Sequence, residues 1–163
     1  VAPSEILEIM EWDEKDSVGG FIVAEPLGSQ VVKAGYGTEF AMSKDIWPNH
    51  PCCVLVVREE IVKKNPEAVL ELTKSLVDLG QIIENDTDRA TEVGAKFLNQ
   101  QPEVIRRVLT EPKDRVTFGE MFPVVKDYDF IQTYLTKIIH AMSDKIDLDK
   151  FVDTQFAQEA GAR

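Results

Sequence analysis

The sequence has few of the residues from which metal sites and nucleophilic sites are built. Its 163 residues include only two cysteines and two histidines. Cys52 and Cys53 are adjacent, and successive strand side chains point to opposite faces, so we expect two small buried hydrophobic residues and no disulfide between them. Together with His50 and His140 they form no spacing typical of a zinc site. The sequence therefore predicts neither a metal centre nor a cofactor.

Long hydrophobic runs are also lacking. The longest uninterrupted one, Cys52–Val57, falls far short of the ~20 residues that a membrane-spanning helix needs. The first residues, Val1–Glu5, contain neither the basic region nor the apolar core of a signal peptide. Because the chain does not begin with methionine, these features leave its compartment open.

Basic residues are in the minority. Lysine and arginine number 18 against 29 acidic residues, which gives a net charge of −11. A surface of this sign repels phosphate backbones and anionic headgroups, so we expect no nucleic-acid partner. The sequence also contains no glycine-rich phosphate loop, no Gly-x-Ser-x-Gly and no His-Glu-x-x-His. The sequence therefore carries none of these catalytic or phosphate-binding motifs.

What is present indicates a globular α/β chain. Hydrophobic residues make up 44% of the sequence and charged residues 29%. Phe21–Ala24 and Cys52–Val57 are short apolar runs without alternation, which predicts strands buried on both faces.

After residue 58 the pattern becomes mostly helical. Asn65-Pro66 and Gln101-Pro102 are typical helix starts, and Asp86 or Thr87 can cap another helix. Apolar residues spaced three and four apart then predict the helix faces. Two further helices are expected before residue 58. The expected helical ranges are 4–12, 26–33, 66–84, 87–98, from 102 onward, and 128–142. His140 should lie on the surface of the last of these helices.

Two strands followed by a run of helices form an incomplete inventory for a sheet. An average sheet has ~5–6 strands, so the sequence lacks strands with which its own should pair. We therefore expect the chain to be part of a larger fold. If it is stable alone, we expect its open strand edges to be covered by a second copy, in a homodimer or a strand-swapped dimer.

An ordered series of short motifs carries a family resemblance. It runs through Gly20–Pro26, a following helix and Gly35-Tyr36-Gly37, then His50–Val57, Asn65–Val69, Asn85–Ala95 and Val152–Thr154. This series resembles the C-terminal half of ABC-transporter solute-binding proteins of the nitrate/sulfonate/taurine type. One departure is Gly19, which stands where that family often has an aspartate.

The resemblance implies an α/β, periplasmic-binding-protein-like type II fold with two lobes, helix-rich here after residue 58. Residues 1–45 would be the end of lobe two, and residues 46–163 a hinge segment and the helical C-terminal part of lobe one. The connector Ser43–His50 would then be the hinge segment. A small organic or inorganic anion, or a related solute, would bind between the lobes as they close about the hinge. The protein would lie in the periplasm or be membrane-anchored outside the cytoplasm, with an ABC permease as its partner.

The expected ligand contacts are Glu25, Pro26, His50 and Cys52. Glu25 lies where a strand ends and a helix begins, the place where α/β sheets bind ligands. Its carboxylate could accept a hydrogen bond from a ligand, or could simply cap the following helix. His50 could donate to a bound anion, or could be a hydrogen-bonding residue of the connector.

Two other functions on the same fold stay open. One is the synthesis or binding of the thiamine pyrimidine precursor, although Cys52-Cys53 falls short of the cysteine-rich motif of those enzymes and no lysine stands out for a Schiff base. The other is a ligand-sensing domain that regulates a kinase or cyclase.

Overall fold

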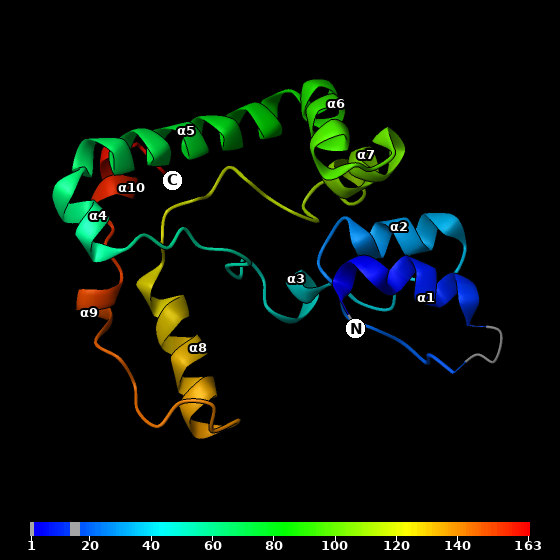
Figure 1. Ribbon diagram of the computed structural model, residues 1–163, viewed down its shortest axis with the longest axis horizontal. Coiled ribbons are helices and arrows are strands. Elements are labelled where there is room, and N and C mark those ends of the chain that lie inside the picture. Colours follow the sequence, from blue (N-terminus) through cyan, green and yellow to red (C-terminus); the bar gives the residue numbers. More distant parts are fainter. Residues whose placement is uncertain (1, 14–16) are drawn as a thin grey trace. The chain divides into compact units, whose positions relative to one another are not determined.

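The computed structural model describes residues 2–13 and 17–163, which form helices joined by irregular segments (Figure 1). The chain divides into two compact units. Unit one consists of Val1–Pro48 and Asn85–Thr117, and unit two of Asn49–Glu84 and Phe118–Arg163. Among the described residues, no helix is both long enough and apolar enough to cross a bilayer.

Unit one is built on helices whose ends follow the capping signals of the sequence. The Asp86 side chain accepts a hydrogen bond from Arg89 N, at 3.0 Å, and so caps α6. Gly35, with φ of 83°, ends α2 in the left-handed conformation that glycine adopts without strain. Helix α6 packs on α7, and α2 packs on both α1 and α7. The helices of unit one are α1 (Ile6–Trp12, preceded by the 3₁₀ turn Pro3–Glu5), α2 (Leu27–Ala34), α3 (Ser43–Ile46), α6 (Thr87–Leu98) and α7 (Pro102–Thr110).

The core of unit one lies where α2, α6 and α7 meet. Val31 of α2 is fully buried, and Val104 of α7 is 2% exposed. Ser29 is buried on the same helix as Val31. The predicted apolar faces of α2 and α7 are thus buried here, whereas Val93 and Phe97, predicted for the apolar face of α6, are 58% and 85% exposed. The packing of α2 on α7 holds the beginning of α2, where Glu25 lies.

Unit two is organised around one long helix. Gly80 of α5 is buried and lets the segment around Phe118 and Met121 approach the helix closely. The amide of Gln132, buried on α8, accepts a hydrogen bond from Ile146 N at 2.9 Å and donates to Asp129 at 3.1 Å, which ties the end of the unit to α8. The helices of unit two are α4 (Glu59–Lys64), α5 (Pro66–Asn85), α8 (Val125–Lys137), α9 (Leu148–Phe151) and α10 (Gln155–Glu159).

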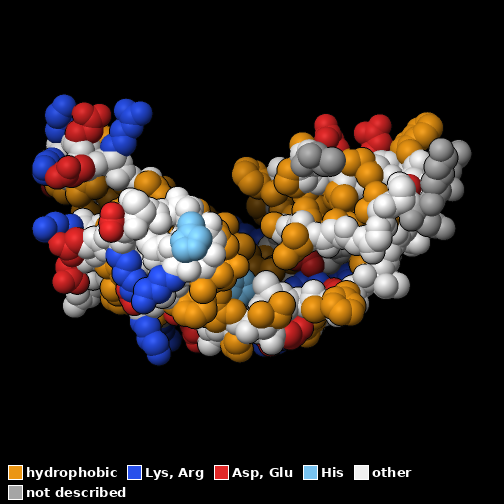
Figure 2. All heavy atoms as spheres, turned by 90° about the horizontal axis from the view of Figure 1, so that it is seen from below, with side chains coloured by type: hydrophobic (Ala, Val, Ile, Leu, Met, Phe, Trp, Pro, Cys, Tyr) orange, Lys and Arg blue, Asp and Glu red, His pale blue; other side chains and the backbone are white. Residues whose placement is uncertain are grey.

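The helix-rich character after residue 58 is confirmed, but the predicted buried strands are not formed. Among residues 2–13 and 17–163 no strand is present, and Ile22 and Val56 are 96% and 78% exposed. Cys52 and Cys53 are likewise exposed, not buried. The reason is that a strand is held by hydrogen bonds to a neighbouring strand, and the described part of the chain supplies none. Hydrophobic side chains accordingly reach the surface over much of the face shown in Figure 2.

Two helix boundaries also differ from those expected. Pro26 precedes α2 as its N-cap residue instead of occupying the first helical position. Helix α8 runs over Val125–Lys137 and ends before the predicted residue 142. His140, with φ of 52°, adopts a left-handed conformation, and Ala141 N and Met142 N both donate to Leu135 O. This turn closes the helix, so His140 lies beyond its end and not within it. The His140 side chain is exposed, as expected.

Candidate functional site

Glu25 lies in unit one, directly before α2, and both of its carboxylate oxygens have partners. One accepts a hydrogen bond from Ser29 N at 3.0 Å, and the other from Ser29 Oγ at 3.0 Å. The first of these bonds satisfies a backbone donor that the start of a helix leaves unpaired. The capping interaction that the sequence allowed for Glu25 is therefore present in the structure.

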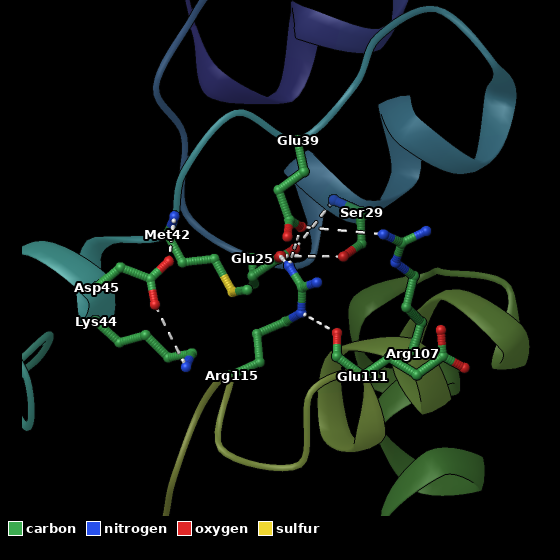
Figure 3. A network of polar contacts seen from close by, with 9 residues as sticks. All are labelled: Glu25, Ser29, Glu39, Met42, Lys44, Asp45, Arg107, Glu111 and Arg115. Carbon is green, nitrogen blue, oxygen red and sulfur yellow. Dashed lines mark hydrogen bonds and ion pairs between the residues drawn. The ribbon is translucent and has the colours of Figure 1, made fainter.

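Arg115, from the segment that follows α7, points between Glu25 and Glu39 (Figure 3). Its Nη1 donates to Glu25 Oε1 at 2.8 Å and to Glu39 Oε2 at 2.6 Å. Its Nε donates to the carbonyl oxygen of Glu111 at 2.8 Å. With its side chain only 4% exposed, Arg115 joins the segment before α2, the segment after α2 and the end of α7. Burial alone would lower the pKa of Arg115, but the hydrogen bonds to Glu39 and Glu25 outweigh it and raise the pKa.

A second arginine balances the charge of this cluster. Arg107 Nη2 lies 3.9 Å from Glu39 Oε2, and the side chain of Arg107 is 29% exposed. Two carboxylates, Glu25 and Glu39, are thus matched by two guanidinium groups within hydrogen-bonding or ion-pair range. The cluster carries no net charge, so it neither attracts an anion as a group of cations would nor repels one as unpaired carboxylates would.

A neighbouring ion pair anchors α3 in unit one. Lys44 Nζ lies 3.0 Å from Asp114 Oδ2 and 3.5 Å from Asp45 Oδ1. The hydrogen bond to Asp114 raises the pKa of Lys44 and lowers the pKa of Asp114. The segment 111–117 is therefore held by Lys44 on one side and by Glu25 and Glu39 on the other.

The other expected ligand contacts lie in different surroundings. Pro26 adjoins Glu25 in unit one, whereas His50 and Cys52 belong to unit two. His50 is half-buried, and the Sγ atoms of Cys52 and Cys53 are 3.9 Å apart as free thiols. Partial burial of Cys52, and then its hydrogen bond with Cys53, raise the pKa of its thiol, so it stays protonated at neutral pH. The structure thus brings Pro26 together with Glu25, and places His50 and Cys52 within a separate compact unit.

Unit two also contains a hollow of about 290 Å³ between α4–α5 and α10. It includes none of the residues expected to bind ligand. Two glutamates and no basic side chain line it, so its charge does not suit an anion. The lining residues are Val62, Pro66, Glu67, Leu70, Gln155, Phe156 and Glu159. Within the residues that the structure describes, no group of three histidine, cysteine or acidic side chains could hold a metal ion.

Sequence reasoning missed Arg115 and Glu39. Arg115 lies 90 residues from Glu25, and no local pattern links the two positions. Their roles follow from the packing of α2 on α7, which brings the ends of these helices together and which local spacing does not reveal.

The chain is similar to several known transport proteins. It is 43% identical over 65 residues to the nitrate import ATP-binding protein NrtC of Synechocystis sp., a match covering 40% of this chain and 10% of that protein. It is 28% identical over 93 residues to the bicarbonate-binding protein CmpA of Synechococcus elongatus, covering 55% of this chain and 21% of that protein. It is also 28% identical over 111 residues to the bicarbonate transport ATP-binding protein CmpC of the same species, covering 66% of this chain and 15% of that protein. No solved structure matches significantly.

These relatives are much longer than the matched region. The chain matches only 10–21% of their length. The sequence profile of the NMT1-like family matches residues 1–98, more than half of the chain. This region contains Glu25, Pro26, His50 and Cys52, together with most of the motifs that carry the resemblance to solute-binding proteins, and the resemblance is thereby confirmed. The chain belongs to the NMT1-like family.

Proposed function

We propose that the chain is part of the solute-binding component of an ABC importer, which captures a small anion or related solute outside the cytoplasm. The observation that carries this proposal is the NMT1-like family match over residues 1–98. The named activity of one relative, bicarbonate binding by CmpA, supports a small anionic solute. Importers of this kind take up nitrate, bicarbonate and sulfonates, so we expect one of these classes.

The charge balance around Glu25 is compatible with such a solute. An isolated pair of carboxylates would repel an anion, whereas Arg115 and Arg107 neutralise Glu25 and Glu39. Glu25 then serves as a hydrogen-bond acceptor for a solute hydroxyl, such as that of bicarbonate. Pro26 adjoins this carboxylate, and we propose His50 as a donor and Cys52 as a neighbouring contact in the assembled site.

The proposed mechanism is closure of two lobes about a hinge. Residues 1–45 as the end of lobe two, residues 46–163 as a hinge segment with the C-terminal part of lobe one, and Ser43–His50 as the hinge stay proposals. One boundary between the two compact units, Pro48–Asn49, falls inside Ser43–His50, but the units themselves do not follow the expected lobes, because residues 85–117 belong with residues 1–48. An ABC permease would then receive the solute from the closed form, and the protein would work in the periplasm or anchored to the outer face of the cytoplasmic membrane.

ATP binding is a second function that the names of NrtC and CmpC raise. Nucleotide binding by P-loop proteins needs a glycine-rich loop whose backbone N–H groups cradle the phosphates, followed by a lysine. The sequence contains no such loop, and its net charge of −11 opposes a polyphosphate. The similarity to these two proteins therefore supports a role in transport without supporting nucleotide binding.

Calorimetric titration and thermal-shift measurements test the proposal. We expect nitrate, bicarbonate or a sulfonate to raise the unfolding temperature above the value in chloride at equal ionic strength, because a ligand that binds only the folded state stabilises it. The Glu25→Gln variant should lose part of that shift. A thiamine pyrimidine precursor is included as a further solute. Turnover of that precursor, or the absence of any shift with the anions, would contradict the proposal.

A further inference from the structure

Two arginines contact the carboxylates of Glu25 and Glu39, and the fold uses them differently. Arg115 donates through Nη1 to Glu25 and Glu39, and through Nε to a main-chain carbonyl oxygen. Arg107 donates no hydrogen bond within the part of the chain that the structure describes. Its Nη2 lies 3.9 Å from Glu39 Oε2, beyond hydrogen-bonding distance, and its Nε is buried without an acceptor. The donors of Arg115 therefore hold the fold together, whereas those of Arg107 are unused.

The position of Arg107 on α7 turns its side chain toward these carboxylates. It follows the buried Val104 by three residues, so the two side chains lie on the same face of the helix. Figure 3 shows its guanidinium group pointing toward Glu39. The preceding residue, Arg106, lies on another face, where its Nη2 donates to Asp88 Oδ1 at 2.7 Å. Of these two neighbouring arginines, only Arg107 therefore reaches the cluster.

Arg107 also belongs to the part of the cluster that water reaches. The side chains of Arg107 and Glu39 are 29% and 30% exposed, whereas that of Arg115 is 4% exposed. A solute that arrives from water thus meets the Nη groups of Arg107 with the Glu39 carboxylate beside them. The two Nη groups of a guanidinium form a planar fork that matches two oxygens of an oxyanion. Such paired hydrogen bonds can bind an anion even though the cluster as a whole is neutral.

We propose that Arg107 binds the oxyanion of the solute through its two Nη groups, while a carboxylate of the cluster accepts a hydrogen bond from a solute hydroxyl. This inference rests on the proposed solute-binding function and narrows the class of solute. Bicarbonate carries both an anionic pair of oxygens and a hydroxyl. Nitrate has only acceptors, so it would face the carboxylate without a hydrogen to donate. We therefore expect bicarbonate to bind more tightly than nitrate.

Isothermal titration calorimetry of the whole chain with bicarbonate and with nitrate, at constant pH and chloride, tests the role of Arg107. Arg107→Met should weaken bicarbonate binding roughly tenfold or more, because both donors are lost. Arg107→Lys keeps the charge but loses the planar fork, so its affinity should lie between those of Arg107→Met and the wild-type chain. Arg106→Met is the matched control, since it removes an arginine of the same helix whose partner is Asp88, and it should leave the affinity unchanged. Circular dichroism checks that each variant keeps its helix content.

Equal bicarbonate affinity of the Arg107→Met and wild-type chains would overturn this inference and leave the proposed function standing, because the solute would then bind through other residues. Bicarbonate binding no tighter than nitrate binding would overturn the role of the solute hydroxyl. If Arg107→Met does not fold, Arg107→Lys decides the question, since wild-type affinity in that variant would exclude the paired donors. Absence of saturable binding of every anion by the wild-type chain would contradict the proposed function itself, and this inference with it.

Discussion

The side chain of Arg115 is only 4% exposed and forms ion pairs with two carboxylates, those of Glu25 and Glu39, which are themselves partly buried. Such a group is costly to bury unless its donors are all satisfied, and here Nη1 and Nε reach Glu25, Glu39 and the Glu111 carbonyl. Removing it would leave two carboxylates facing each other with only Arg107, 3.9 Å from Glu39, as a nearby cation. Arg115 is therefore a positioning residue for Glu25 and for the start of α2.

Arg115→Met should lower the free energy of unfolding of unit one by about 2–4 kcal/mol, since it removes a charge-assisted cluster while keeping similar side-chain volume. Urea unfolding followed by tryptophan fluorescence reports on unit one, because both tryptophans, Trp12 and Trp47, belong to it. The control is Arg106→Met, which removes the exposed ion pair with Asp88 and should change stability by less than about 1 kcal/mol. Equal effects of the two variants would show that the cluster is not a structural anchor.

The ion pair between Asp129 and Lys145 predicts a pH dependence in unit two. The hydrogen bond from Lys145 Nζ, at 2.9 Å, and then that from Gln132 lower the pKa of Asp129 below 3.8. Because the folded pKa is depressed, its stabilising contribution is present above the unfolded pKa of 3.8 and is lost as the pH falls through the folded value.

We therefore expect the stability difference between the wild-type chain and Asp129→Asn to shrink as the pH is lowered from about 6 to about 2.5. Thermal unfolding followed by circular dichroism at each pH measures it. The other carboxylates titrate alike in both chains, so the difference isolates Asp129. A difference that stays constant through this range would show that the ion pair does not stabilise the folded state.

At the scale of the element, local signals predicted the helices far better than the strands. Asn65-Pro66, Asp86 and Gln101-Pro102 mark helix starts within one residue, because capping depends on neighbours only a few positions away. The end of α8 was missed because a left-handed turn at His140 closes it, and nothing in the spacing announces that turn. The strands failed because Phe21–Ala24 and Cys52–Val57 need partners from distant sequence, and local composition cannot supply them.

The approach of Phe118 and Met121 to α5 gives a test at this scale. A Cβ added at Gly80 would lie 2.5 Å from Met121 Cε and closer still to the Phe118 carbonyl oxygen. Gly80→Ala should therefore lower the free energy of unfolding by about 1–3 kcal/mol, despite the better helix propensity of alanine. Gly94→Ala on α6 is the control, since its Cβ would meet only Ile105 Cγ2, at 3.2 Å, and its net effect should be within about 1 kcal/mol of zero.

Chemical denaturation followed by far-ultraviolet circular dichroism compares these two glycine variants. A destabilised Gly80→Ala chain beside a Gly94→Ala chain of nearly wild-type stability is the expected result. If both variants were equally stable, the segment around Phe118 and Met121 would not pack on α5 as described.

At the scale of the whole molecule, the candidate site is only partly visible from sequence. The family resemblance pointed to Glu25 and Pro26, and the family match over residues 1–98 includes both. The carboxylate network around Glu25 depends on the packing of α2 against α7, a contact between segments some 70 residues apart that also brings Lys33 to Glu103. Sequence patterns that span only a few neighbouring residues cannot predict contacts between such distant segments. The identity of the solute depends on groups that must converge in three dimensions, which is why the sequence indicates a class of solute and not a single one.

The proposed function is that this chain serves a transport system by binding its solute and not its nucleotide. Equilibrium dialysis against labelled bicarbonate, labelled nitrate and labelled ATP, each with excess chloride, tests that distinction most directly. We expect saturable retention of bicarbonate or nitrate, reduced in Glu25→Gln, and no saturable retention of ATP. Saturable retention of ATP without retention of either anion would contradict it.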